Sequence, residues 1–504
     1  MAGTVGDTAQ APREIELKLD CAGSGLLALA AHPLLEAAPE RLVTIYYDTP
    51  ARDLRAAGLT LRVRASGGRF VQTVKDGAGG AGLFDRAEWE AEVAGETPEP
   101  AAWAGTAAEA VLREAGAAPE RVFATVMARR AASVSHGTSR ILVTLDEGQV
   151  ESAQGVATLC ELELEVESGL PADLFGLAQA LAETVPLRLG VLSKSARGFA
   201  LLDGAGPAAT KAGPVALSKG ASAAEVFRSV ARSCLRHLRL NETVFLESGP
   251  DPDALHQMRV ALRRLRTALA LFAPLLDGDA RAASLGDEIK QVTEPFGQAR
   301  NLDVYLAETL PALAQRHPDD PGLDDLRRRA QERREGAYAA VTAILDSPEW
   351  RGLLLDIAGW VETGAWAERP AATRDGRALA AHVLERARRR LKRRSRGLKR
   401  LDAHARHRAR IAAKRLRYGA EFFAGLYPKT SARRRHKAFT AALADLQDRL
   451  GALNDLATAH AVTEGLIGAG GPPLPEPSEA AVADLLARAA AARSELLDVK
   501  RFWR

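Results

Sequence analysis

The segment EIELKLD occupies residues 14–20, and its charged and apolar side chains alternate along almost its whole length. Successive side chains of a β-strand point to opposite faces, so Glu14, Glu16 and Lys18 share one face. The apolar residues Ile15, Leu17 and Leu19 share the other face. The segment therefore predicts a strand with one charged and one apolar side.

The same period of two recurs through the first third of the chain. The further segments are TLRVRA (60–65), FVQTVK (70–75), AEWEAEV (87–93), RILVTLD (140–146) and LCELELEVE (159–167). Gly-rich turns and helical stretches near 106–115 and 173–185 lie between them. This pattern predicts an antiparallel sheet or barrel with accessory helices.

The charged faces of these strands allow two interpretations. A single charged face is normally solvated. Several such faces in one sheet could instead point into a barrel, where they would form a cavity with acidic and basic walls. Crowded carboxylates are tolerated chiefly when a divalent cation offsets them, and hard oxygen ligands favour Mg²⁺ or Mn²⁺. The basic residues would then suit a polyanion.

Length and charge divide the chain into two parts. A chain of 504 residues is too long for one core. Residues 1–214 hold 19 Lys/Arg against 28 Asp/Glu, a net charge of −9, which leaves +13 for the remainder. We predict a disordered N-terminus (1–12), a barrel domain (13–203), a linker (204–222) and a helical domain (223–504). A Pro-rich break at 470–479 precedes one last helix.

Cysteine usage and hydropathy indicate the compartment. Cys21, Cys160 and Cys234 are odd in number and far apart, which argues against a disulfide framework and a thiolate metal site. No apolar run approaches the roughly 20 residues of a membrane span, and no secretory signal is expected at the start. We therefore expect a cytoplasmic protein.

An internal repeat marks the basic part of the chain. The segment HQMRVALRRLRTALALF (256–272) aligns with HRARIAAKRLRYGAEFF (407–423), and FGQARNLD (296–303) aligns with LGALNDLA (450–457). Helical geometry gives each copy one basic and one apolar face. The repeat predicts two similar helical units, near 225–345 and 375–500, about a pseudo-twofold axis. A solvated, Arg-rich surface remains the alternative explanation of the basic face.

Residues 14–205 resemble the CYTH family of triphosphate tunnel metalloenzymes, whose ExExK signature matches residues 14–18. Further matching motifs follow in order: YYDTP (46–50), LRVR (61–64), QTVK (72–75), RAEWE (86–90), FATVMAR (123–129), LDEG (145–148), ELELE (161–165) and SKSARG (193–198). The resemblance implies an α+β chain that begins with an eight-stranded antiparallel tunnel barrel. It also implies metal-dependent chemistry on triphosphates.

The resemblance assigns roles to individual positions. The implied metal ligands are Glu14, Glu16, Asp146, Glu161, Glu163 and Glu165. The implied substrate contacts are Lys18, Arg62, Arg64, Lys75, Arg129, Lys194 and Arg197, and the implied catalytic residues are Glu14, Glu16, Lys18 and Lys75. Arg86, Glu88 and Glu90 match an R-x-E-x-E strand that would bind metal or hold basic residues. Val126 departs from the family, which often has a basic residue there.

The basic part, about 215–504, resembles the CHAD domain. The resemblance implies two tandem four-helix bundles with a basic groove that binds inorganic polyphosphate. The implied groove residues are His256, Arg259, Arg263, Arg264, Arg266, His407, Arg410, Lys414, Arg415 and Arg417, with Asn301 and Asp455 as anchors. Nucleic acid is a weaker ligand for the run RARRRLKRRSRGLKR (386–400), because stacking aromatic residues are almost absent there.

These patterns lead to several functional hypotheses. The first is a bacterial-type, Mg²⁺- or Mn²⁺-dependent inorganic triphosphatase tethered to a polyphosphate-binding module, with an association with polyphosphate granules. The second is a non-catalytic polyphosphate or granule scaffold. The third is a class IV-type adenylate cyclase, and nucleic-acid binding is a fourth. The general base, oligomeric state and preferred substrate stay open at this point.

Overall fold

A computed structural model describes residues 13–21, 25, 28–29, 32–76, 80–204, 206–316, 318–320, 322–467 and 479–504, without the side chains of 454–457. The chain forms two compact units. The first comprises Met1–Ala208 and Ser347–Thr363, and the second comprises Ala209–Asp346 and Gly364–Arg504. The predicted N-terminal tail and nearly all of the Pro-rich break lie outside the described residues. No described helix is long and apolar enough to cross a membrane.

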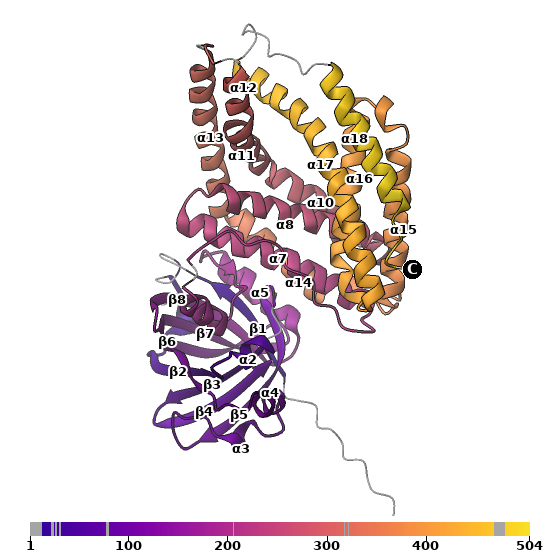
Figure 1. The fold of residues 1–504 in the computed structure, drawn as a ribbon. Helices are drawn as coiled ribbons and strands as arrows, with labels where there is room; N and C mark the ends of the chain where they lie inside the picture. Colours follow the sequence, from indigo (N-terminus) through magenta and orange to yellow (C-terminus); the bar gives the residue numbers. More distant parts are fainter. Residues whose placement is uncertain are drawn as a thin grey trace, which may run out of the picture. The chain divides into compact units, whose positions relative to one another are not determined.

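Eight antiparallel strands close into a barrel in the first unit (Figure 1). The strands are β1 (Arg13–Asp20), β2 (Glu40–Asp48), β3 (Leu59–Ser66), β4 (Arg69–Asp76), β5 (Leu83–Val93), β6 (Glu120–His136), β7 (Ser139–Ser152) and β8 (Gly155–Ser168). Their order is β5-β4-β3-β2-β6-β7-β8-β1, and the pairing of β1 with β5 closes the ring. Glu14 lies opposite Arg86 at this closure. The expected eight-stranded antiparallel barrel is thus confirmed.

The apolar faces of the strands pack outward under short helices. Leu17 and Leu19 of β1 are fully buried, and α5 (Pro171–Ala182) contacts β1 and β8. Leu61 and Val74 belong to a cluster with Leu54 of α2 (Asp53–Ala56) and Leu112 of α4 (Ala107–Ala115). Because side chains alternate, this outward packing turns the charged faces toward the barrel interior.

Smaller elements complete the first unit. These are η1 (Pro33–Leu35), α3 (Pro100–Trp103), β9 (Arg188–Leu189), α6 (Lys194–Leu202) and α14 (Pro348–Thr363). The two-residue strand β9 pairs with β1, so that Leu189 lies opposite Leu19. Helix α14 contacts α5 and β9, although the sequence pattern placed its residues in the helical domain.

The structure corrects one expectation about cysteine. Cys21 and Cys160 form a disulfide, with their Cα atoms 5.7 Å apart, and only Cys234 is a free cysteine. The register explains the pairing, because Asp20 lies opposite Glu161 and the next pair along the two strands is Cys21 and Cys160. Sequence separation concealed this proximity, since the two cysteines are 139 positions apart.

The second unit is helical, as expected. Its first group consists of α7 (Ala223–Ser248), α8 (Pro252–Leu271), α9 (Ala273–Leu276), α10 (Ala280–Val292), α11 (Glu294–Val304), the π-helical turn η2 (Tyr305–Thr309), α12 (Leu310–Arg316) and α13 (Gly322–Asp346). Its second group consists of η3 (Ala365–Glu368), α15 (Gly376–Arg394), η4 (Leu398–Arg400), α16 (Ala403–Phe422), η5 (Ala424–Leu426), α17 (Thr430–Ile467) and α18 (Glu479–Asp498). The groups meet through α7 with α15 and α8 with α16.

The internal repeat has a structural counterpart in α8 and α16. Both helices have 20 residues, and both their first and last residues differ by the same 151 positions that separate His256 from His407. Each begins after an N-cap aspartate, Asp251 or Asp402, whose side chain accepts backbone N–H groups. The equivalent residues Phe272 and Phe423 contact each other with ring centroids 5.5 Å apart. Contact between equivalent residues is expected where a pseudo-twofold axis passes between two copies.

Candidate functional site

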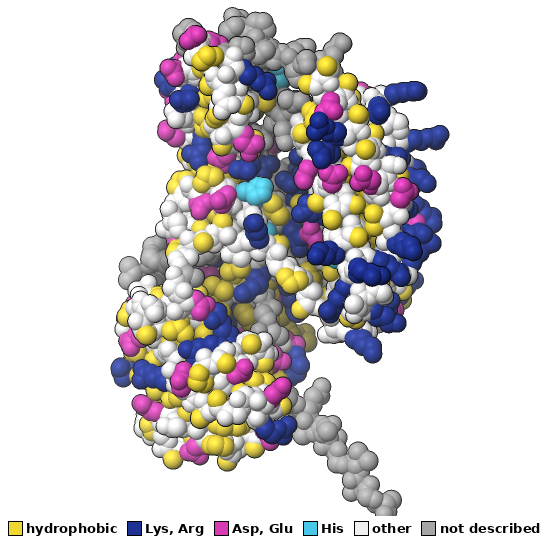
Figure 2. Space-filling model, viewed as in Figure 1, with side chains coloured by type: hydrophobic (Ala, Val, Ile, Leu, Met, Phe, Trp, Pro, Cys, Tyr) yellow, Lys and Arg dark blue, Asp and Glu magenta, His cyan; other side chains and the backbone are white. Residues whose placement is uncertain are grey.

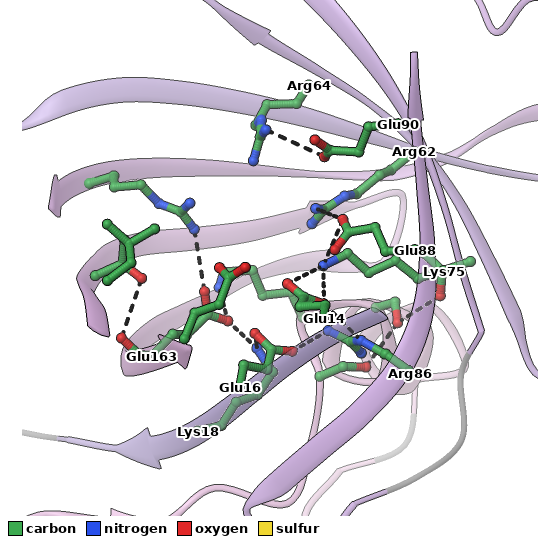
Figure 3. A pocket seen from close by; sticks show the side chains of 18 of the residues that line it. Glu14, Glu16, Lys18, Arg62, Arg64, Lys75, Arg86, Glu88, Glu90 and Glu163 are labelled. Atoms are coloured by element: carbon green, nitrogen blue, oxygen red, sulfur yellow. Dashed lines mark hydrogen bonds and ion pairs between the residues drawn. The ribbon is translucent and has the colours of Figure 1, made fainter. Parts of the chain in front are cut away.

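The charged strand faces line one cavity of about 280 Å³ inside the barrel (Figure 3). The basic lining residues are Lys18, Arg62, Arg64, Lys75, Arg86, Arg129 and Lys194, and the acidic ones are Glu14, Glu16, Glu88, Glu90, Glu163 and Glu165. They come from β1, β3, β4, β5, β6 and β8, with Lys194 added from the start of α6. The cavity therefore collects side chains that are up to 180 positions apart in the sequence.

One cluster of ion pairs surrounds Glu14. Lys75 Nζ lies 2.7 Å from Glu14 Oε2 and 3.0 Å from Glu88 Oε1. Arg86 Nε lies 3.1 Å from Glu14 Oε2, and the same guanidinium donates to Glu16. Burial alone would raise the pKa of Glu14, but Lys75 and Arg86 lower it to about 2. Glu14 is thus held as a carboxylate at any physiological pH.

A second cluster surrounds Glu163. Lys18 donates to Glu163 Oε1, and Lys194 Nζ lies 3.0 Å from the same oxygen. Lys194 also lies 2.7 Å from Asp146 Oδ2, which accepts from Arg129 at 2.6 Å. Burial would lower the pKa of Lys18, but Glu16, Glu163 and Glu161 raise it to about 12. Burial would also lower the pKa of Lys194, but Asp146, Glu161 and Glu163 raise it well above its ordinary value. The two lysines therefore stay charged although they are buried.

Glu165 differs from its neighbours because no described side chain pairs with it. It lines the cavity from β8, and burial together with Glu14 and Glu16 raises its pKa to about 7.

The remaining lining pairs are looser, with Arg62 at 3.6 Å from Glu88 and Arg64 at 3.6 Å from Glu90. Arg62 and Arg64 are therefore the lining cations that carboxylates hold least closely.

Three buried carboxylates could hold a metal ion. Asp146, Glu161 and Glu163 each offer an oxygen within 4.8 Å of the others. Glu161 Oε2 is buried and has no hydrogen-bond partner among the described residues. An orphaned carboxylate oxygen beside two further carboxylates suits a hard divalent cation. Glu14 and Glu16 lie instead among Lys75 and Arg86, outside this group of three.

The arrangement can exchange partners. In this structure most cations of the cavity pair with a carboxylate, so most of the buried charges have a compensating neighbour. A phosphate chain can take the lysines and arginines as donors, and a divalent cation can take the carboxylates that are released. The cavity is thus chemically suited to a phosphate chain that enters together with a metal.

Some expected residues lie elsewhere, and others were missed. Arg197 pairs with Asp20 at 2.6 Å and is not among the lining residues. Asp48 of the YYDTP motif accepts backbone N–H groups of Thr49, Leu54 and Arg55, which is a local structural role. The lining residues that were not named as site residues are Tyr46, Thr60, Leu142, Thr144, Ser193 and Ser195. Their hydroxyl-bearing members carry no charge alternation that could have revealed them.

The helical unit contains a basic pocket on α8. Arg259, Arg263 and Arg266 line about 400 Å³ together with Lys290 of α10 and a few further residues, of which only Glu294 is acidic. His256 lies beside Arg300, Arg263 and Arg259, and burial with these three cations lowers its pKa to about 4. The imidazole is therefore neutral at pH 7. Lys290 and Arg300 were not anticipated as members of this group.

A second basic pocket of about 360 Å³ lies on α15 and α16. Its polar lining is Arg386, Arg390, Arg393, Arg394 and Arg415, and no carboxylate is among its lining residues. Burial and the cations Arg390, Arg394 and Arg266 lower the pKa of Arg415. Figure 2 shows Lys and Arg side chains gathered over the part of the helical unit that α15 to α18 build. Uncompensated arginines in a recess form a ready site for an anion.

The other expected groove residues lie in different settings. Arg264, the repeat partner of Arg415, is buried, pairs with Glu421 and stacks on Phe422. Arg417 contacts Glu421 at 2.9 Å and Gln447 at 3.2 Å. His407 is exposed, and Arg410 and Lys414 are half-buried on the same helix. Asn301 is exposed on α11, and the side chain of Asp455 lies outside the described residues.

The fold and cavity define a barrel protein with a charged internal tunnel and a duplicated basic helical domain. Residues 12–199 match the family model of the CYTH domain, and residues 229–464 match that of the CHAD domain. The chain therefore contains a CYTH domain followed by a CHAD domain.

Individual relatives resemble one part of the chain or the other. An inorganic triphosphatase of Haemophilus influenzae is 29% identical over 195 residues, which cover 38% of this chain and 55% of that protein. The chain thus spans about half the length of this curated relative. The CHAD domain from the plant Ricinus communis is 32% identical, with a TM-score of 0.49 and coverage of 58% of this chain and 98% of that one. A Hippeastrum protein proposed as an adenylyl cyclase, with a dominant triphosphatase activity, is 21% identical, with a TM-score of 0.29 and coverage of 37% and 95%.

Proposed function

We propose that the barrel cavity hydrolyses inorganic triphosphate with the help of a divalent metal, Mg²⁺ or Mn²⁺. The observation that carries this proposal is the meeting of seven cationic and six acidic side chains in one cavity. The CYTH family match and the similarity to an inorganic triphosphatase support it. A water oxygen would bond to the terminal phosphorus while the bridging P–O bond breaks, releasing orthophosphate and pyrophosphate.

The residues divide the work by charge. Lys18, Lys75, Arg62, Arg64, Arg129 and Lys194 would bind the phosphate oxygens and neutralise the charge that develops on them. Asp146, Glu161 and Glu163 would hold the metal, which supplies Lewis-acid polarisation of the phosphoryl group when bound. Glu14 and Glu16 would orient Lys75 and Arg86 through the ion pairs described above. Arg197 is left out of the substrate contacts because it pairs with Asp20.

The helical domain is proposed to bind inorganic polyphosphate in its two basic pockets. Arginine guanidinium groups suit bare phosphate chains because they donate in a planar fork. The absence of carboxylates among the lining residues of the α15–α16 pocket supports an anionic ligand. An association with polyphosphate granules is the location that we propose from this binding.

A phosphate-release panel tests the catalytic proposal. The purified chain is supplied with tripolyphosphate, ATP, thiamine triphosphate or long-chain polyphosphate, each with Mg²⁺ and with Mn²⁺. The proposal expects orthophosphate and pyrophosphate from tripolyphosphate at the highest rate, and loss of this activity on chelation. Cyclic AMP from ATP would instead establish a cyclase. Polyphosphate binding without hydrolysis of any substrate would establish a scaffold.

A further inference from the structure

Helix α14 belongs to the barrel unit although the chain around it belongs to the helical unit. The segment Ser347–Thr363 groups with the barrel, whereas Asp346 before it and Gly364 after it group with the helical unit. The chain therefore passes between the units near residues 208, 346 and 363, not once through a single linker. Both ends of α14 continue into the helical unit, so its packing within the barrel unit calls for a structural explanation.

The packing of α14 is apolar and close. Its buried residues include Trp350, Leu354, Leu355, Ile357, Ala358 and Val361. It contacts α5 and β9, and α5 contributes a buried apolar face of its own. Gly359 lies against the ring of Phe175, so closely that a Cβ at residue 359 would lie 3.1 Å from Phe175 Cγ. The glycine thus allows a close approach of the helix backbone to the aromatic ring, and a Cβ there would press on the ring.

The strand that α14 contacts leads directly to the cavity lysines. Beyond β9, the Gly190 N–H donates to the Lys18 carbonyl at 2.8 Å. A Cβ at Gly190 would lie 3.0 Å from that carbonyl oxygen, so the two backbones are closely fitted. Three residues later Ser193 caps α6, and Lys194 is the first residue of that helix. Lys18 and Lys194 both contact Glu163 Oε1.

We propose that α14 is a positioning element for the cavity, although the chain on both sides of it belongs to the helical unit. By packing on α5 and β9 it fixes the segment 187–194 and therefore the ammonium groups of Lys18 and Lys194. The inference rests on the proposed triphosphatase function for its kinetic consequence, but not for its structural one. Any change that displaces α14 should first weaken binding of the phosphate chain, because Lys18 and Lys194 are proposed phosphate contacts.

A matched pair of glycine variants in the full chain tests this role. Gly359→Ala and Gly352→Ala make the same change on the same helix, but a Cβ at residue 352 would meet nothing within 4 Å. Gly359→Ala should raise the KM for tripolyphosphate severalfold with a smaller change in kcat, and Gly359→Leu should raise it further. Gly352→Ala should leave both constants as in the unmodified chain. Equal KM values in all four proteins would overturn the proposal.

Hydrogen exchange gives a readout that does not need catalysis. Amide protons of 187–199 should exchange at least several times faster in Gly359→Leu, while those of β4 keep their rates. If the unmodified chain hydrolyses nothing, the proposed function fails, and this exchange measurement still decides whether α14 positions the segment. Unchanged exchange over 187–199 would refute the positioning role even if activity fell.

Two further variants separate positioning from general loss of stability. Phe175→Ala removes the ring from the other side and should raise KM in the same way, which covers the case in which Gly359→Leu does not fold. Leu112→Ala opens a cavity under α4, against β3 and β4, and lowers the melting temperature without touching β9. If Leu112→Ala raised KM as much as Phe175→Ala for the same loss of melting temperature, the effect would be structural and the proposal would fall.

Discussion

At the scale of single residues, the barrel interior is a network in which buried charges compensate one another. Glu14 contacts both Lys75 and Arg86, so removing its charge leaves two cations with fewer partners. Breaking one partner out of a buried pair typically costs about 3–5 kcal/mol, because the remaining charge is stranded. Catalysis and stability are therefore coupled at these positions.

Glu14→Gln should lower kcat/KM for tripolyphosphate by about 100-fold, because Lys75 loses the carboxylate that orients it. The matched control is Asp85→Asn, which makes the same chemical change on β5 beside the exposed Arg13. Steady-state phosphate release with Mg²⁺ checks both variants. Polyphosphate binding should persist in each, and an active Glu14→Gln enzyme would contradict the role given to Glu14.

At the proposed polyphosphate site, His256 should make anion binding depend on pH. Its pKa of about 4 lies below the ordinary value because burial, Arg300, Arg263 and Arg259 disfavour the charged ring, with Asp253 acting weakly against them. A bound polyanion offsets those cations and raises the pKa, so binding takes up a proton. Affinity should rise by up to about tenfold from pH 7.5 to pH 5.5. Calorimetry at the two pH values checks this, and His256→Asn should flatten the difference.

At the scale of elements, duplication has given α8 and α16 the same length and the same caps but different surroundings. Arg264 on α8 is buried against Glu421 and Phe422, whereas its equivalent Arg415 on α16 lines a basic pocket. The counterpart of Glu421 in the first copy is Ala270, so the acidic partner exists only once. The two copies should therefore contribute unequally to anion binding.

Arg390→Gln combined with Arg394→Gln should weaken binding of long-chain polyphosphate by about tenfold or more. Each substitution removes a guanidinium group and its charge-assisted contact with the phosphate chain. The control is Arg328→Gln on α13, where the arginine is exposed and paired with Asp325 and Glu332. Fluorescence titration with labelled polyphosphate compares the variants. Hydrolysis of tripolyphosphate should not change in either, and equal affinities would remove the α15–α16 pocket from the binding site.

The link between β1 and β8 gives a direct chemical prediction. Because Cys21 and Cys160 are joined, the denatured protein should show one reactive thiol per chain, that of Cys234, before reduction. After reduction three thiols should react. A thiol assay in denaturant, with and without a phosphine reductant, checks this. Three reactive thiols in the untreated protein would mean that the pair exists as free cysteines.

Several features could be predicted from the sequence because they are local. The charged residues Glu14, Glu16 and Lys18 alternate with apolar residues, and this segment forms the strand β1. Its charged side lines the cavity, and its apolar side packs outward. β2 escaped notice because Ile45 and Tyr46 are consecutive and both buried, which hides the period of two. β6 runs for 17 residues, beyond the usual length of a strand, and its last residues alternate between exposed and half-buried positions.

At the scale of the whole molecule, the unpredicted features depend on contacts between residues that are distant in sequence. Lys194 contacts Glu163, and α14 packs against Phe175. Neither contact produces a periodic pattern in the sequence of the two segments that it joins. The two units also differ in charge, since the acidic part of the chain carries the barrel and the basic part most of the helices. The resemblance to two families supplied the fold of each part, but not the three chain passages between the units.

The near balance of cations and carboxylates in the barrel has a consequence for encounter rates. A cavity whose charges cancel projects little field beyond a few ångströms, so it cannot draw a triphosphate in from a distance. Its association rate should respond weakly to ionic strength, because a Debye length of about 8 Å already exceeds the reach of such local pairs. The arginine recess on α15 and α16 should behave in the opposite way. Lowering the salt concentration should then accelerate anion binding to the α15–α16 pocket and leave the rate of triphosphate entry into the barrel almost unchanged.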